Sequence, residues 1–158
     1  MPAAWFHVDS IPPADSATLL DAKEAKHALG SRRLAPGDRV MLFDRFGTAA
    51  EAVLTGDRAA GGDLEVEVGT SRRIASPIPR IELAASLPKG DRMSTMLDMA
   101  TQLGMSAFRP LHCDYSVITT DRKRRDPTDR WHRVMLEACK QSRRAWTPEI
   151  LEAGSPAE

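Results

Sequence analysis

The sequence predicts an α+β protein in which a small β-barrel is followed by an incomplete parallel α/β sheet. The first part of the chain contains closely spaced strand candidates and one early helix, which is typical of a small barrel. In the last part strands and helices alternate, which is the pattern of parallel βαβ units. A polar stretch that contains Pro77 and Pro79 separates the two patterns. We therefore expect one domain over residues 1–73 and another over residues 80–158.

The expected barrel is preceded by a helix over residues 21–29, which Gly30 is predicted to end. Three short apolar runs follow it, and turns that contain glycine separate them. The last run alternates apolar and acidic side chains with the period of two that a half-buried strand requires. The three expected strands are residues 39–43, 49–55 and 64–68.

The second domain is expected to contain three parallel strands and two helices. Its first helix is predicted to have Asp91 as its N-cap and to stop at Gly104, because the apolar residues between them recur on one helical face. The last strand of such a sheet would have unpaired backbone groups along one edge, so we expect a further segment or a partner chain to cover that edge. The expected elements are strands at residues 81–87, 107–111 and 148–151, and helices at residues 92–103 and 128–143.

Composition and cysteine spacing exclude several classes of protein. No apolar run approaches the length of a membrane-spanning helix and no signal peptide is recognisable, so we expect a cytoplasmic protein. Cys113 and Cys139 show no metal-ligand spacing, so we expect reduced thiols and no metal site. Neither a glycine-rich dinucleotide motif nor a phosphate-binding loop is present in the sequence. The run His112-Cys113-Asp114 cannot form a catalytic triad, because consecutive side chains project in different directions.

The formal net charge of zero hides an asymmetry along the chain. Residues 1–70 have 7 lysines and arginines against 11 aspartates and glutamates, a net charge of −4. Residues 120–146 have 9 against 4, a net charge of +5. This segregation indicates a polyanionic partner for the second half, although a solvated basic helix face would look the same. Lys89 and Arg92 flank a turn between a strand and a helix, where open α/β sheets bind ligands and free N–H groups favour anions; the alternative is a flexible turn with solvated charges.

For each of three residues the sequence is compatible with two interpretations. Trp131 fits the apolar face of the last helix, which favours the core. Trp146 follows that helix, where stacking on a base and plain packing are equally compatible with the sequence. His27 lies beside Lys23 and Lys26 on the early helix, where a partly buried structural imidazole is favoured over a contact with RNA.

Three segments of the chain resemble a known family. The first is Ala25-Lys26-His27, continued by Arg32-Arg33-Leu34-Ala35-Pro36-Gly37-Asp38 and Leu42-Phe43-Asp44 up to Gly47. The second is Leu83-Ala84-Ala85-Ser86-Leu87-Pro88-Lys89-Gly90-Asp91-Arg92-Met93, continued by Gln102-Leu103-Gly104. The third is Glu137-Ala138-Cys139-Lys140-Gln141-Ser142-Arg143-Arg144, followed by Pro148-Glu149-Ile150. In order and spacing the chain resembles the 16S ribosomal RNA uridine-N3 methyltransferases, which belong to the SPOUT class and have an N-terminal PUA-like barrel.

The resemblance implies a PUA-like RNA-binding barrel over residues 1–73 and the N-terminal part of a SPOUT methyltransferase domain over residues 80–158. It further implies a cytoplasmic homodimer that acts on 16S rRNA in the small ribosomal subunit, without metal or membrane, and S-adenosylmethionine as methyl donor. In the family the donor binds to a C-terminal Gly-Pro-Glu-Gly-Gly loop and an Arg-Thr-Glu-Thr segment, and neither occurs in this sequence. The donor site is therefore expected beyond residue 158, and no catalytic residue is assigned. The residues expected to bind RNA are Arg32, Arg33, Lys89, Arg92, Arg122, Lys123, Arg124, Arg125 and Arg144.

Some polar positions depart from the family pattern. The residues that stand where the family has Arg, Lys, Arg, Glu and Gly are Ala4, Met99, Tyr115, Lys140 and Arg143. Such changes spare the apolar framework and affect expected contacts with RNA or a second subunit. The sequence therefore favours uridine N3 methylation by a longer chain, with a non-catalytic RNA-binding relative in ribosome assembly as the alternative. A structural partner that pairs its open sheet edge with another chain is the third and least favoured hypothesis.

Overall fold

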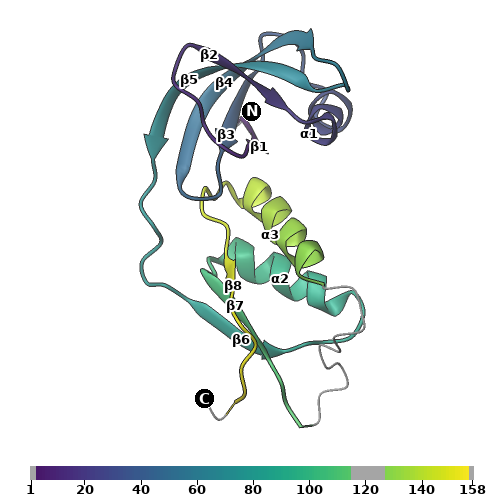
Figure 1. The fold of residues 1–158 in the computed structure, drawn as a ribbon, viewed down its shortest axis with the longest axis vertical. Helices are drawn as coiled ribbons and strands as arrows, with labels where there is room; N and C mark the ends of the chain where they lie inside the picture. Colours follow the sequence, from purple (N-terminus) through teal and green to yellow (C-terminus); the bar gives the residue numbers. More distant parts are fainter. Residues whose placement is uncertain (1–2, 115–126, 157–158) are drawn as a thin grey trace. The chain divides into compact units, whose positions relative to one another are not determined.

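The computed structural model describes residues 3–114 and 127–156 (Figure 1). The chain divides into two compact units, Met1–Ser76 and Pro77–Glu158, and each has its own buried cluster of apolar side chains. The last strand of the first unit ends at Arg73, and the division between the units falls between Ser76 and Pro77.

The first unit is built on a five-stranded sheet with the order β1-β3-β4-β5-β2. Its strands are β1 (Ala4–His7), β2 (Ser16–Leu20), β3 (Arg39–Phe43), β4 (Thr48–Arg58) and β5 (Leu64–Arg73). β1 pairs in parallel with β3, and the other neighbours are antiparallel. The three predicted strands are confirmed, although β4 and β5 are longer than expected, and the prediction had omitted both β1 and β2.

The early helix is present but does not stop at Gly30. Asp21 caps α1 (Ala22–Lys26) by accepting a hydrogen bond from the Glu24 amide at 2.8 Å, and the chain continues directly into a π-helix, η1 (His27–Ser31). Ala25 of α1 and Ala28 of η1 belong to the same buried cluster as Phe6. The helical segment therefore completes the core of the first unit.

The expected closed barrel is not found in the strand pairing. β1 and β2 form the two ends of the sheet order and do not pair with each other, so the sheet is open. Side chains of α1 and η1 join the core instead of a further strand pair. The sequence pattern could not distinguish these arrangements, because both bury the same apolar faces of the strands.

The second unit has the predicted alternation of strands and helices. Its elements are β6 (Glu82–Ser86), α2 (Arg92–Leu103), β7 (Ala107–Leu111), α3 (Thr128–Ser142) and β8 (Glu149–Ile150). The sheet has the order β6-β7-β8 and both pairs are parallel, as predicted for this part of the chain. Asp91 is the N-cap of α2, and Gly104 ends it in the left-handed region with φ of 112°.

The core of the second unit lies between its sheet and its two helices. Phe108 of the middle strand β7 is fully buried, and its ring meets that of Trp131 on α3 edge to face, with centroids 5.7 Å apart. Leu83 and Ile150 flank Phe108 on the neighbouring strands, and Leu97 of α2 joins the same cluster. The prediction that Trp131 is a core residue is confirmed.

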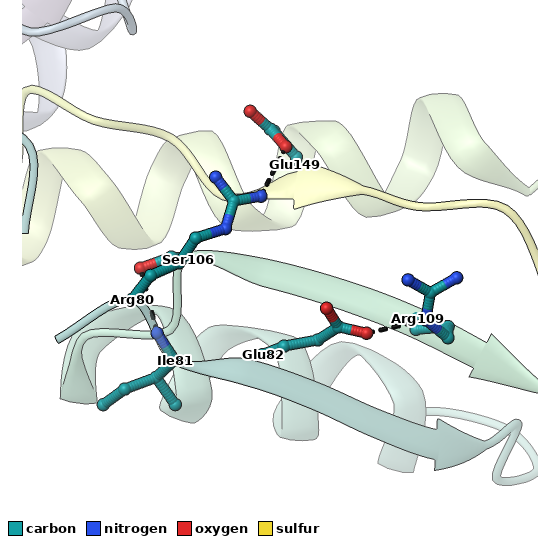
Figure 2. A network of polar contacts seen from close by, with 6 residues as sticks. All are labelled: Arg80, Ile81, Glu82, Ser106, Arg109 and Glu149. Carbon is teal, nitrogen blue, oxygen red and sulfur yellow. Dashed lines mark hydrogen bonds and ion pairs between the residues drawn. The ribbon is translucent and has the colours of Figure 1, made fainter. Parts of the chain in front are cut away.

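Polar contacts link the three strands of the second sheet (Figure 2). Arg80 donates to Glu149 on β8 at 2.7 Å, and Arg109 on β7 donates to Glu82 on β6 at 2.6 Å. Exposed ion pairs of this kind stabilise a fold by at most about 1 kcal/mol. They connect side chains that are far apart in the sequence.

Candidate nucleic-acid interface

The turn between β6 and α2 presents two of the predicted RNA-binding cations. Leu87 and Met93 are buried and anchor the turn on both sides, whereas Lys89 and Arg92 are exposed. The first turn of α2 receives no hydrogen bond from the side chain of its N-cap, Asp91. Free N–H groups at a helix start and two nearby cations are the features that favour a phosphate.

The Asp91 carboxylate instead accepts a hydrogen bond from Arg130 of α3, at 3.3 Å. Arg130 also donates to the Ser94 hydroxyl at 3.1 Å. Arg130 and Ser94 line a groove of about 580 Å³ between α2 and α3. The groove is lined by Ser94, Thr95, Asp98, Arg130, Arg133, Val134 and Glu137. Because two arginines face two carboxylates there, the groove has no surplus of positive charge to attract a polyanion.

Other cations of α3 and its C-terminal end are also engaged within the second unit. Lys140 is buried and lies 3.0 Å from a Glu137 carboxylate oxygen. Arg144, one of the predicted RNA contacts, is half-buried, and its Nη2 donates to the Met105 carbonyl at 3.5 Å. Its Nη1 lies 3.0 Å from the position that a Cβ on Gly104 would take, so Arg144 packs on the end of α2. The positive charge counted along the sequence is thus only partly available to a ligand.

The remaining predicted contacts lie elsewhere. Arg32 and Arg33 are exposed just after η1, and Arg33 has a positive φ of 53°. The basic run of Arg122, Lys123, Arg124 and Arg125 lies outside the described residues. All of these RNA contacts remain predictions. The structure brings Lys89 and Arg92 together on one turn, and Arg32 and Arg33 belong to the other unit.

The structure gives contacts for two residues that the sequence left open. The His27 ring lies edge to face with the buried Phe6, with centroids 6.2 Å apart, which favours the structural interpretation. Trp146 is half-buried, and its carbonyl accepts a hydrogen bond from the Cys139 thiol at 3.5 Å. Burial raises the pKa of Cys139 to about 11, although a hydrogen bond with Thr147 and the charge of Arg144 act in the opposite direction. The Cys139 thiol is therefore protonated at neutral pH and is not a nucleophile.

The turn between β3 and β4 was not predicted as a site, and there the Arg45 guanidinium carbon lies 5.7 Å from the centroid of the Phe46 ring. The sequence signal that could have identified this turn is an arginine next to an aromatic residue between two strands.

Within the described ranges, no group of three or more histidine, cysteine or acidic side chains is suited to hold a metal ion. Within the same ranges, none of the helices has the length and apolar content needed to cross a membrane.

Replacing Lys89 and Arg92 together by alanine should weaken the binding of single-stranded RNA and make it less dependent on salt. Each lost phosphate contact lowers the magnitude of the log–log salt slope by about 0.7, so a change of about 1.4 is expected for two contacts. Fluorescence anisotropy titrations at several salt concentrations measure the slope. Arg80→Ala is the control, because Arg80 is a cation of the same unit that pairs with Glu149. Equal slopes for the double variant and the unchanged protein would contradict this assignment.

The parallel β6–α2–β7–α3–β8 arrangement defines an α/β domain, a class of fold that binds its ligands at the carboxyl ends of the strands. Residues 75–157, essentially the whole second unit, match the family described as RNA methyltransferase domain. The chain belongs to this family. The match confirms the family resemblance that the sequence predicted.

Individual relatives agree with this assignment. The chain is 31% identical over 151 residues to ribosomal RNA small subunit methyltransferase E of Mycobacterium bovis, covering 95% of this chain and 57% of that protein. Among solved structures, a putative methyltransferase of Legionella pneumophila with the bound cofactor SAM has a TM-score of 0.84 at 18% identity, covering 98% of this chain and 64% of that one. A ribosomal RNA small subunit methyltransferase E from Neisseria gonorrhoeae, bound to S-adenosyl methionine, has a TM-score of 0.81 at 24% identity, covering 98% and 62%. At these identities the two structures show the fold alone, and the chain spans about three fifths of the length of all three relatives.

Proposed function

We propose that residues 1–158 form part of an S-adenosylmethionine-dependent enzyme that methylates N3 of a uridine in 16S ribosomal RNA. The observation that carries the proposal is the family match over residues 75–157, which coincides with the parallel α/β unit. The M. bovis relative, which matches 95% of this chain, is named as a small-subunit rRNA methyltransferase. The comparisons favour this enzyme over a non-catalytic RNA-binding protein.

In this proposal the two units have different tasks. The first unit acts as a PUA-like module that holds RNA, which the five-stranded sheet over residues 4–73 supports although the sheet is open. The second unit is the N-terminal part of a SPOUT methyltransferase domain, and Lys89 and Arg92 position RNA phosphates next to it. The small ribosomal subunit is the partner, the protein acts in the cytoplasm, and it works as a homodimer.

The described residues do not fit S-adenosylmethionine at the carboxyl ends of β6 and β7. Lys89 and Arg92 are exposed, and a Cβ added at Gly90 would meet no atom within 4 Å, so this turn encloses nothing. We therefore assign the donor site to a region outside residues 1–158. The uridine N3 proton must leave before or during methyl transfer, which requires a base, and we assign no residue of this chain to that step.

The proposed activity is tested on ribosomal RNA from cells with and without the gene. Nucleosides of purified 16S rRNA are separated and quantified by mass spectrometry. Cells that lack the gene should lose a 3-methyluridine signal, and reintroduction of the full-length gene should restore it. A 3-methyluridine content that is the same in both strains would refute the proposed reaction.

A further inference from the structure

We propose that the turn between β3 and β4 is a stacking platform for an unpaired RNA base. This turn, residues 44–48, is called the Phe46 turn. The inference rests on the proposed RNA-binding function of the first unit. It adds a specific contact, in which the Phe46 ring stacks on a base while neighbouring arginines meet the flanking phosphates.

The Phe46 side chain is placed differently from the other aromatic residues near it. Phe43, at the end of β3, is fully buried and Trp5 is almost so, whereas Phe46 is 59% exposed. Single exposed apolar residues are common on protein surfaces and need no explanation by themselves. Two further observations, the rigidity of the turn and the charges beside it, suggest that this ring has a ligand.

The backbone of the Phe46 turn is fixed by hydrogen bonds on both sides of the ring. The Asp44 carboxylate accepts from the Phe46 amide at 2.8 Å and from the Thr48 amide at 2.9 Å. The Gly47 carbonyl accepts from the Ile74 amide, just after β5, at 2.7 Å. A ring held on a preformed turn loses little backbone freedom when a base stacks on it, so more of the stacking energy appears as affinity.

One arginine lies next to the exposed ring, and two more lie on the strand that pairs with the end of the turn. The Arg45 guanidinium lies 5.7 Å from the ring centroid, and Arg73 donates to the Thr48 hydroxyl at 3.1 Å. Arg72 is exposed and pairs in register with Ala49, directly after the turn. Aromatic rings flanked by cations are the combination that proteins use for single-stranded nucleic acids, because each nucleotide offers both a base face and a phosphate.

The same residues are a poor match for a protein partner. The other large apolar side chains of the first unit that are prominently exposed, Leu19 and Val53, lie on β2 and β4 and not in the Phe46 turn. A protein interface usually has a contiguous apolar centre with few charges. One exposed aromatic ring with Arg45 beside it, on a turn next to two arginines of β5, therefore favours RNA.

The test uses the whole chain and two RNA oligonucleotides of about twelve nucleotides, which is within the site size of small single-strand binding folds. One is unstructured RNA, and the other has the same backbone without bases. Phe46→Ala should weaken binding of the first RNA about tenfold and leave its salt slope unchanged, because stacking releases no counterions. It should not change binding of the abasic RNA, and Phe46→Trp should keep the affinity of the unchanged protein.

Leu19→Ala is the matched control, because it removes another exposed apolar side chain of the first unit. Circular dichroism checks that all variants remain folded. If Phe46→Ala binds the unstructured RNA as tightly as the unchanged protein does, the stacking platform is refuted and the proposed RNA-binding function is not. An equal loss of affinity for both RNAs also refutes only the platform. If the unchanged protein binds neither RNA, the proposed RNA-binding function fails and the platform fails with it.

Discussion

Phe108→Ala is expected to lower the free energy of unfolding of the second unit by about 3–5 kcal/mol, the usual cost of removing a buried phenylalanine ring. Phe108 is fully buried on the middle strand of the sheet, next to Leu83 and Ile150 in register. Its ring also forms the edge-to-face contact with Trp131, which adds a smaller term. The variant therefore loses contacts to both neighbouring strands and to α3.

Urea denaturation followed by circular dichroism and tryptophan fluorescence measures this change. Leu103→Ala is the control, since Leu103 is an apolar residue of the same unit that is 82% exposed. It should change the free energy of unfolding by no more than about 0.5 kcal/mol. Similar small effects for both variants would show that the second core is not organised around Phe108.

Asp44→Ala is expected to destabilise the first unit by about 2 kcal/mol at neutral pH, because two backbone amides lose a charged acceptor. Partial burial acts to raise the pKa of Asp44. Hydrogen bonds from Thr48 and Phe46 and the charge of Arg73 outweigh it, so the pKa lies below its ordinary value. A carboxylate with a lowered folded-state pKa stabilises the fold above its unfolded pKa, and that stability is lost as the pH falls through the folded value.

The stability difference between the unchanged protein and Asp44→Ala should therefore be constant near neutral pH and should shrink as the pH falls below about 4. Urea denaturation at a series of pH values measures it. Asp57→Ala, which removes an exposed carboxylate from β4, is the control and should have little effect at any pH. A difference that grows on acidification would have the wrong sign and would contradict the role assigned to Asp44.

The sequence predicted the elements that depend on local patterns. β3, β7 and the ends of α2 lie where expected, because strand runs, the cap position of Asp91 and the left-handed Gly104 are all determined within a few residues. β1 and β2 were missed because their stabilising partners are distant. Ala4 pairs with Val40, and Ser16 with Val68, and neither short strand has a periodic pattern of its own.

The candidate site was less predictable than the fold. Counting charge identified cations but not their neighbours, so Arg130, Lys140 and Arg144 appeared available although each interacts with other groups of the second unit. The exposure of Phe46 was likewise hidden, because an aromatic residue after a strand is more often part of a core. Lys89 and Arg92, and likewise Arg32 and Arg33, are exposed as a contact with RNA requires, and their binding of RNA stays a prediction.

The two separate apolar cores also determine how unfolding can be described. The buried clusters around Phe6 and around Phe108 share no residue, and each lies within one unit. A chain with two such clusters need not melt as one cooperative block, so a single midpoint or a single free energy can average over two transitions. Trp5 reports on the first unit and Trp131 on the second. Replacing Trp5 with phenylalanine leaves tryptophans only in the second unit, and replacing both Trp131 and Trp146 leaves only Trp5 in the first, so fluorescence would follow each transition separately.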